Sequence, residues 1–411
     1  MPLENAQIKP GSGVNLEIFL FFAGFFLATY LLGKLLQKLR IPWIFSSLLL
    51  GLLLALHNPF SDITSSTTFD FLSQLGMLLL LFVIGFELDL KEISKSGAFV
   101  VRTTLALILA EAFVGSILVH YVFDVPWVVS IIVATSFATV GEAFILPILD
   151  EFKLTRTKLG QAILGVGVLD DIVELTAIIA ATVLVDKTLH SPNSAVGYNL
   201  LILASIFLAA FMLGKARIVS SLFKTKDASA SILLVFLVIF LFAGIGAIVD
   251  AAPLGALLAG LALQSVIPKS SVKFIDSDIK SVAYGIFAPT FFLSVGISAD
   301  MNYILGFPLL IVLVTAMTMA TKIGASYITG RRILGEKGSI IMGFGLSLKF
   351  STSIVIIKLL FQKELIGPDL YSVLIGSTIV FMILVPILLS NIIKHWGVGS
   401  PEAQGMVQRQ K

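Results

Sequence analysis

The sequence GQAILGVGVLDDIVELTAIIAATVLV, residues 160–185, places two adjacent aspartates in the middle of an apolar stretch that is long enough to cross a bilayer. A bilayer core about 30 Å thick needs about 20 apolar helical residues per crossing. Each ionisable side chain near the centre of such a helix costs about 2.5–3.5 kcal/mol on insertion. Asp170 and Asp171 are therefore predicted to face the interior of a helical bundle or a wet cavity and to serve function.

The composition of the whole chain also indicates a membrane protein. Of 411 residues, 57% are hydrophobic and only 13% are charged, whereas soluble domains carry about 25% charged residues. The net charge of +3 is too small to indicate a nucleic-acid partner. The chain has no cysteine, which excludes disulfides and thiolate metal sites.

Apolar runs separated by polar breaks predict about thirteen transmembrane helices, an all-α fold. The expected spans are 15–37, 41–57, 70–88, 97–121, 126–149, 160–185, 198–216, 229–249, 253–267, 282–299, 304–328, 338–361 and 370–392. The second and ninth are short for a crossing, and the charge pattern is the reason to keep them.

The basic residues alternate between the two sides of the predicted bundle. Cytoplasmic loops are enriched in Lys and Arg. If the N-terminus is outside, 22 of the 28 basic residues fall in or next to the inner loops and the C-terminal tail, three fall outside and three lie within spans. This pattern predicts an N-out, C-in protein of the cell membrane. Residues 395–411 are expected to form a disordered cytoplasmic tail.

Two pairs of glycine-centred motifs indicate an internal repeat. The second span (SSLLLGLLLAL, with Gly51) matches the ninth (GALLAGLALQS, with Gly260), and VIGFELD, with Gly85, matches SVGISAD, with Gly296. The glycines are offset by 209 and 211 residues, so one duplication fits both pairs. Because the matching spans lie seven crossings apart, the two copies must run through the bilayer in opposite directions. Inverted repeats with a site between them are typical of secondary transporters.

A third carboxylate, Glu174, shares a helix side with Asp170 and Asp171. Three buried carboxylates in one turn repel one another, so we expect them to titrate as a coupled group. Carboxylate oxygens together with water suit a proton or an alkali cation, and soft ligands for a transition metal are missing. The alternative, strongest for Glu174, is that these acids only pair with basic residues to join helices.

Lys322, in the predicted span 304–328, is the natural partner for one of these acids. An intramembrane lysine facing an aspartate forms a salt bridge, and Asp170 is our first choice of partner. The alternative is that the lysine extends to the cytoplasmic interface.

The fifth and twelfth spans contain residues that weaken a helix. Ser/Thr clusters that include Ser136 and Ser351 lie near glycines, and Glu142 and Lys349 carry opposite charges at corresponding places in the two repeats. We expect these charges to offset the dipole ends of broken helices or to pair with each other. Ordinary helix–helix hydrogen bonding is an equal alternative for the hydroxyls. The charged residues of the fourth span, Arg102 and Glu111, are assigned structural roles.

Several of these segments resemble a known family, the monovalent cation/proton antiporters of Kef, Nap and Nha type. The similar segments are LLLLFVIGFELD, TSFATVGEAFILPILDE, LGQAILG with the following Asp-Asp, PLGALLAGLAL and PTFFLSVGISAD, in the family's order and over essentially the whole chain.

This resemblance implies a fold of thirteen helices in two inverted repeats, with broken helices crossing in spans 5 and 12. It also implies two domains. Segments 14–90 and 196–300 would form a dimerisation domain, and segments 95–187 and 302–392 an ion-translocating core.

At the site, the resemblance implies that Asp171 binds the cation, that Asp170 pairs with Lys322, and that the Thr139 hydroxyl lies near the ion. An Asp-Asp pair with a lysine is similar to the electrogenic sodium/proton members, whereas Kef-type potassium exchangers tend to have Gln-Asp. The run LKFSTS departs from the family, because other members often carry Gly-Glu there, and Glu142 beside the break is unusual.

Taken together, the sequence predicts a homodimeric antiporter that exchanges Na+ for protons, without a cofactor or enzymatic activity, and serves pH homeostasis. A Kef-type K+/H+ exchanger and a cation channel on the same scaffold are the alternatives. Two further alternatives are disfavoured. A membrane sensor requires a soluble output domain, which the sequence does not show, and an organic-anion symporter requires more cationic residues for an anion site. We expect no nucleotide gating, because the regulatory domain of Kef proteins is missing from the sequence.

Overall fold

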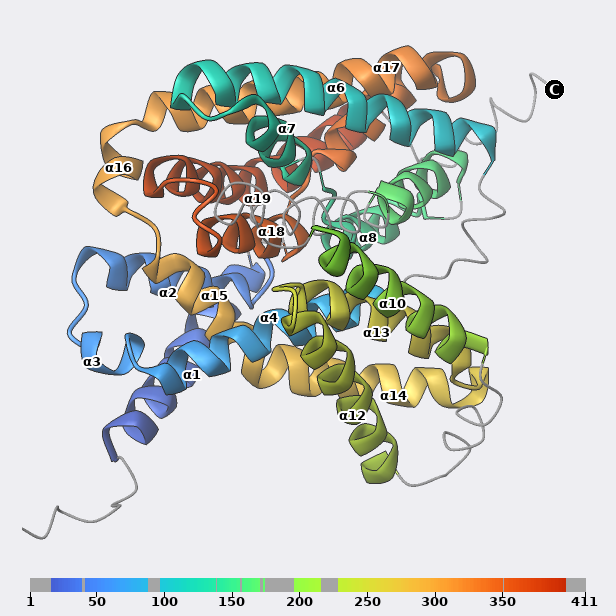
Figure 1. The fold of residues 1–411 in the computed structure, drawn as a ribbon. Coiled ribbons are helices and arrows are strands. Elements are labelled where there is room, and N and C mark those ends of the chain that lie inside the picture. The colour runs from blue at the N-terminus through green and yellow to red at the C-terminus, as the bar shows by residue number, and fades with distance from the viewer. Residues whose placement is uncertain are drawn as a thin grey trace, which may run out of the picture.

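A computed structural model describes residues 16–38, 41–87, 97–137, 139–155, 157–170, 173, 196–215, 228–349 and 351–396. These residues form helices and connecting turns, with no strand in the described ranges. The prediction of an all-α protein is therefore confirmed for the part of the chain that can be seen (Figure 1).

The helices follow one another with short connections. They are α1 (Leu16–Lys38), α2 (Phe45–Leu56), α3 (Ser61–Thr64), α4 (Thr67–Glu87), α6 (Ala98–Phe123), α7 (Trp127–Ser136), α8 (Glu142–Glu151), α10 (Val196–Lys215), α12 (Ala228–Ala247), α13 (Ala252–Val266), α14 (Lys269–Val282), the π-helical turn η1 (Ala283–Phe287), α15 (Ala288–Ile297), α16 (Met301–Gly306), α17 (Pro308–Leu346), α18 (Ser351–Gln362) and α19 (Pro368–Trp396). A further helix covers 158–170.

Seven of the described helical segments are long and apolar enough to cross a membrane, and five shorter apolar helices accompany them. Their bounds agree with the predicted spans to within a few residues at most places, as in α6, where 97–121 was expected. The full count of thirteen stays a prediction, because much of the sixth span lies outside the described residues.

The tenth span begins earlier than predicted. We expected 282–299, but α14 starts at Lys269 and continues through η1 into α15 without a break. The predicted span left out the first half of this long helix, because the sequence of that half, KSSVKFIDSDIKSV, is largely polar. That half is an amphipathic helix. Asp276 and Lys280, which are one helical turn apart, form an ion pair of 2.9 Å that stabilises it.

The eleventh and twelfth spans are joined by a turn at Gly335. Helical geometry runs through α17 except at this glycine, whose φ of 74° and ψ of 173° are open essentially to glycine alone. The turn falls between the predicted ends at 328 and 338, so the two spans are distinct although their helices follow directly.

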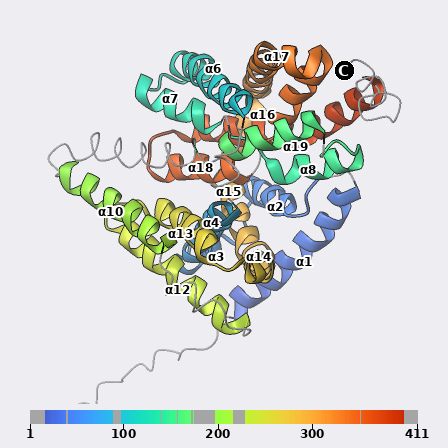
Figure 2. The ribbon, with the colours of Figure 1, turned by 90° about the vertical axis from the view of Figure 1, so that its right-hand side faces the viewer.

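The helices divide into two groups in both ribbon views (Figures 1 and 2). In one group α4 packs on α13, α2 on α15, and α12 on α13; in the other α6 packs on α7 and α17, and α17 on α19. Between the groups, α18 contacts both α19 and α4.

Glycines bring the first group's helices into backbone contact. A Cβ atom on Gly51 of α2 would lie 2.3 Å from the carbonyl oxygen of Leu293 in α15, and one on Gly260 of α13 would lie 2.2 Å from that of Phe82 in α4. Small residues permit such close packing. In a lipid bilayer the hydrophobic effect does not drive helices together, so van der Waals packing of this kind does.

Three hydrogen bonds link the two groups near the end of α15. Lys358 Nζ of α18 donates to Ser298 Oγ at 2.6 Å, and Tyr371 Oη of α19 donates to the Val295 carbonyl at 2.9 Å. The amide of Asp300 donates to Ser372 Oγ at 2.8 Å. Any movement of one group against the other must therefore exchange these contacts.

Candidate functional site

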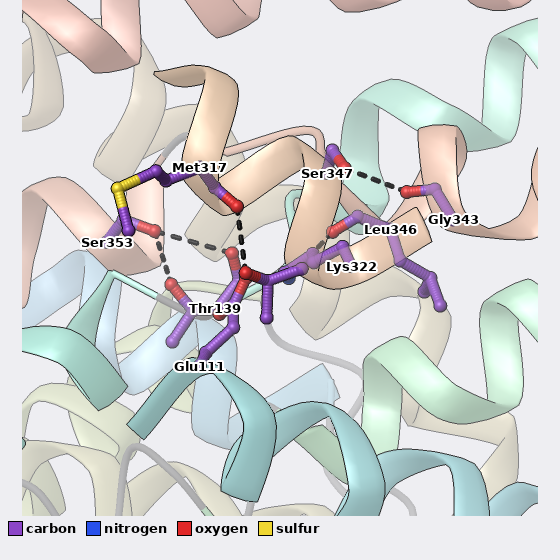
Figure 3. A network of polar contacts seen from close by, with 9 residues as sticks. Glu111, Thr139, Met317, Lys322, Gly343, Leu346, Ser347 and Ser353 are labelled. Carbon is purple, nitrogen blue, oxygen red and sulfur yellow. Dashed lines mark hydrogen bonds and ion pairs between the residues drawn. The ribbon is translucent and has the colours of Figure 1, made fainter. Parts of the chain in front are cut away.

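Two helix interruptions lie against each other in the middle of the fold. α7 ends at Ser136 and α8 begins at Glu142, while α17 ends at Leu346 and α18 begins at Ser351. The Gly141 amide donates to the Leu348 carbonyl at 2.6 Å. The hydroxyls of Thr139 and Ser353 are hydrogen-bonded to each other (Figure 3). The predicted weak points of the fifth and twelfth spans are thus real breaks, and they meet.

Local side-chain chemistry accounts for both breaks. Ser136 Oγ donates to the Val133 carbonyl at 2.7 Å, and Ser347 Oγ donates to the Gly343 carbonyl at 2.8 Å. Such bonds compete with the helical backbone ladder near its end. Gly343 also allows a close approach, since a Cβ there would lie 2.5 Å from Ile323 Cα. Ser136 is the last residue of α7 and Ser351 is the first residue of α18.

Thr139 is fully buried at the meeting point of the two breaks. Besides the hydroxyl contact, Ser353 Oγ lies 3.4 Å from the Thr139 carbonyl oxygen. The arrangement gathers two hydroxyls and the non-helical backbone of 139–141 and 347–349 in one small region. Oxygen atoms of this kind suit a hard alkali cation.

Lys349 is fully buried beside the breaks. Its ammonium lies 4.4 Å from the ring centroid of Phe137 and 5.5 Å from that of Phe381, which are cation–π distances. The side chain of Glu142 lies outside the description, so a Glu142–Lys349 pair stays a prediction. The sequence did not indicate the aromatic neighbours of Lys349.

Lys322 of α17 is buried, with 1% of its surface exposed, and does not extend to the membrane interface. Its Nζ donates to the Leu346 carbonyl at 2.7 Å. That carbonyl closes the helix that precedes the second break, where the helix dipole favours a cation. The lysine therefore links the eleventh span, in which it lies, to the helix break in the twelfth span.

Glu111 of α6 lies on the other side of Lys322, with Oε1 4.0 Å from Nζ (Figure 3). The carboxylate borders a cavity of about 30 Å³ whose lining is otherwise largely apolar. The assignment of Glu111 to a structural role did not anticipate this position. The signal was present, because an acid within an apolar span is a functional candidate by default.

Asp170 is buried and helical, with 1% of its surface exposed, and residues 171–172 after it lie outside the described ranges. Asp171 and Glu174 lie outside the described residues, so the acidic cluster itself and the Asp170–Lys322 pair stay predictions. What the structure places in one region are Thr139, Ser353, Lys322, Lys349 and Glu111, around the two breaks.

A family model, sodium/hydrogen exchanger, transmembrane, matches residues 24–395. The chain belongs to this family. The sodium/hydrogen exchanger family consists of transporters, not enzymes, and its members are multi-pass proteins of the cell membrane. The predicted resemblance and localisation are confirmed by this match.

Two relatives align with most of this chain. A Na(+)/H(+) antiporter of Enterococcus hirae is 28% identical over 89% of this chain and 96% of its own. The Na(+)/H(+)-K(+) antiporter GerN of Bacillus cereus is 23% identical over 92% and 96%. The solved structure of the sodium proton antiporter MjNhaP1 from Methanocaldococcus jannaschii has a TM-score of 0.65 at 16% identity, covering 92% of this chain and 96% of that one. That last likeness shows a shared fold.

Proposed function

We propose that this protein is a secondary antiporter that exchanges Na+ for protons by alternating access, and that the exchange is electrogenic. The observation that carries the proposal is the buried lysine, Lys322, held between a helix break and a buried acid in a family of sodium/hydrogen exchangers. The name of the Enterococcus hirae relative supports Na+ as the cation.

In the proposed cycle, Asp171 exchanges a proton for the cation while Asp170 holds Lys322. Cation binding releases Asp170 from Lys322. When the lysine also gives up its proton, two protons move for each Na+. The Thr139 and Ser353 hydroxyls and backbone carbonyls at the breaks supply further oxygen atoms near the ion. Ser136 and Ser351, at the edges of the breaks, are accessory candidates, and Glu174 and Glu142 are also accessory.

The proposal includes two inverted repeats within about thirteen spans, N-out and C-in. The glycine contacts support it. Gly51 and Gly260 match in sequence, as do Gly85 and Gly296; in space Gly51 meets Gly296 and Gly85 meets Gly260. Exchanging the two repeats turns the first contact into the second, which is what a two-fold axis requires.

The two helix groups support a scaffold and a moving core. Segments 14–90 and 196–300 would form the dimerising scaffold of a homodimer, and segments 95–187 and 302–392 the core that carries the ion. The few hydrogen bonds near Ser298 and Tyr371 between them are of a kind that can be exchanged during movement.

A K+/H+ exchanger is the second candidate, because the name of the GerN relative includes K(+). The two candidates differ in a current measurement on protein reconstituted in a solid-supported membrane. We expect a transient current after a Na+ concentration jump, because unequal numbers of charges cross, and a much smaller current after a K+ jump.

Equal or larger currents with K+ would favour the potassium exchanger. Proton movement without any current would show electroneutral exchange, in which Lys322 keeps its proton. Empty membranes, measured with the same jumps, give the background.

A further inference from the structure

Glu111 is a buried acid that the proposed cycle does not use. It lies within the apolar helix α6 with 4% of its surface exposed, and Lys322 opposite it is 1% exposed. Burying a charge is costly unless the charge is paired and hydrogen-bonded. The acid therefore needs a reason to be there.

The surroundings of Glu111 give it little besides Lys322. Neither of its carboxylate oxygens has a hydrogen-bond partner among the described residues. Its cavity is lined by apolar side chains such as Val133, Phe137 and Leu374, together with Thr318 and Thr321. Among the described residues, the charges that act on it are those of Lys322 and Lys349. If Glu111 served only to join two helices, we would expect its carboxylate to accept hydrogen bonds from a neighbouring helix.

The contact between Glu111 and Lys322 is also loose. Charge-assisted hydrogen bonds between an ammonium and a carboxylate have lengths of about 2.7–2.9 Å. The distance here is 4.0 Å, while the same Nζ lies 2.7 Å from the Leu346 carbonyl. Lys322 is thus anchored to the helix break and only attracted by Glu111, which leaves its charge able to change partner.

We propose that Glu111 is a second carboxylate partner of Lys322, which competes with the aspartate pair for the lysine and so sets how strongly the site binds the cation. This inference rests on the proposed function. A cation that enters at Asp170 and Asp171 must displace Lys322, and Glu111 gives the displaced ammonium a counter-charge within reach. Glu111 acts through Lys322 and is a positioning residue.

The first test compares Glu111→Gln with the unaltered protein in proteoliposomes. Without the competing carboxylate, Lys322 holds the aspartates more tightly, so the apparent KM for Na+ should rise about tenfold, which corresponds to about 1.4 kcal/mol of binding free energy. The rate at saturating Na+ should change little. Ser116→Ala is a matched control, because Ser116 is buried on the same helix and bonds to its own helix at the Phe113 carbonyl. Its KM should not change.

A second measurement shows whether the effect passes through Lys322. Sodium affinity is read from the Na+-dependent rise in the unfolding temperature of the purified protein, which does not need a transport-competent variant. In a Lys322→Gln background, Glu111→Gln should add no further loss of affinity. A persisting tenfold loss would mean that Glu111 attracts the cation directly, and would overturn the inference.

Glu111→Asp covers the case in which the glutamine variant does not fold. It keeps the charge but draws it back by one methylene, so the KM should rise by less than tenfold. A KM equal to that of the unaltered protein in every folded Glu111 variant, or a lower maximal rate at unchanged KM, overturns the inference and shows a structural role. If the unaltered protein itself shows no response to Na+, the proposed function fails instead.

Discussion

Asp171→Asn is expected to reduce Na+-driven proton movement to the level of protein-free liposomes. Asparagine keeps the size of the side chain but cannot carry a proton or offer a negative charge to a cation. In the proposed cycle Asp171 does both, so the loss should be complete at every pH. The measurement is the Na+-induced recovery of a pH-sensitive dye in proteoliposomes with an imposed proton gradient.

The matched control for this substitution is Asp124→Asn. Asp124 is an exposed aspartate that ends α6 in the left-handed conformation, with φ of 52°, which asparagine adopts readily. The control should keep the activity of the unaltered protein. An Asp171→Asn protein that is folded and exchanges at a normal rate would remove Asp171 from the site.

Gly260→Val is expected to prevent the assembly of the fold or to destabilise it by about 3 kcal/mol or more, since overpacking a tight contact costs this much when backbone must move. A Cβ at Gly260 would lie 2.2 Å from the Phe82 carbonyl oxygen and 2.7 Å from the Phe86 amide nitrogen. Backbone atoms of α4 cannot yield as a flexible side chain does, so α4 and α13 must separate. The readout is the yield of monodisperse protein in detergent and its unfolding temperature.

Gly244→Val provides the comparison within the same group of helices. A Cβ at Gly244 of α12 would meet nothing within 4 Å, and the position is exposed. This variant should purify with normal yield and an unfolding temperature close to that of the unaltered protein. Equal behaviour of the two variants would contradict the close α4–α13 contact.

Much of the helical framework could be predicted because its signal is local. The apolar run over 70–88 became α4, and the Ser/Thr cluster with Gly141 indicated the break at 137–141. Helix α14 was missed, because its sequence is polar and amphipathic and a hydropathy pattern detects only apolar runs.

The contacts of the site were harder to predict. Glu111 and Lys322 are 211 positions apart, and no periodicity in the sequence encodes which buried acid faces which buried lysine. The same holds for Lys349 and Phe137, which meet only because two helix breaks adjoin. Sequence identifies a costly charge in an apolar span, and tertiary packing decides its partner.

Radioactive sodium uptake into proteoliposomes shows whether the buried site exchanges Na+ for protons. With an acidic interior, no membrane potential imposed and equal Na+ on both sides, the protein should accumulate sodium inside above the outer concentration until the proton gradient is spent. A channel would only equalise sodium. No accumulation by the folded, unaltered protein with its proton gradient intact would contradict Na+/H+ exchange by this protein.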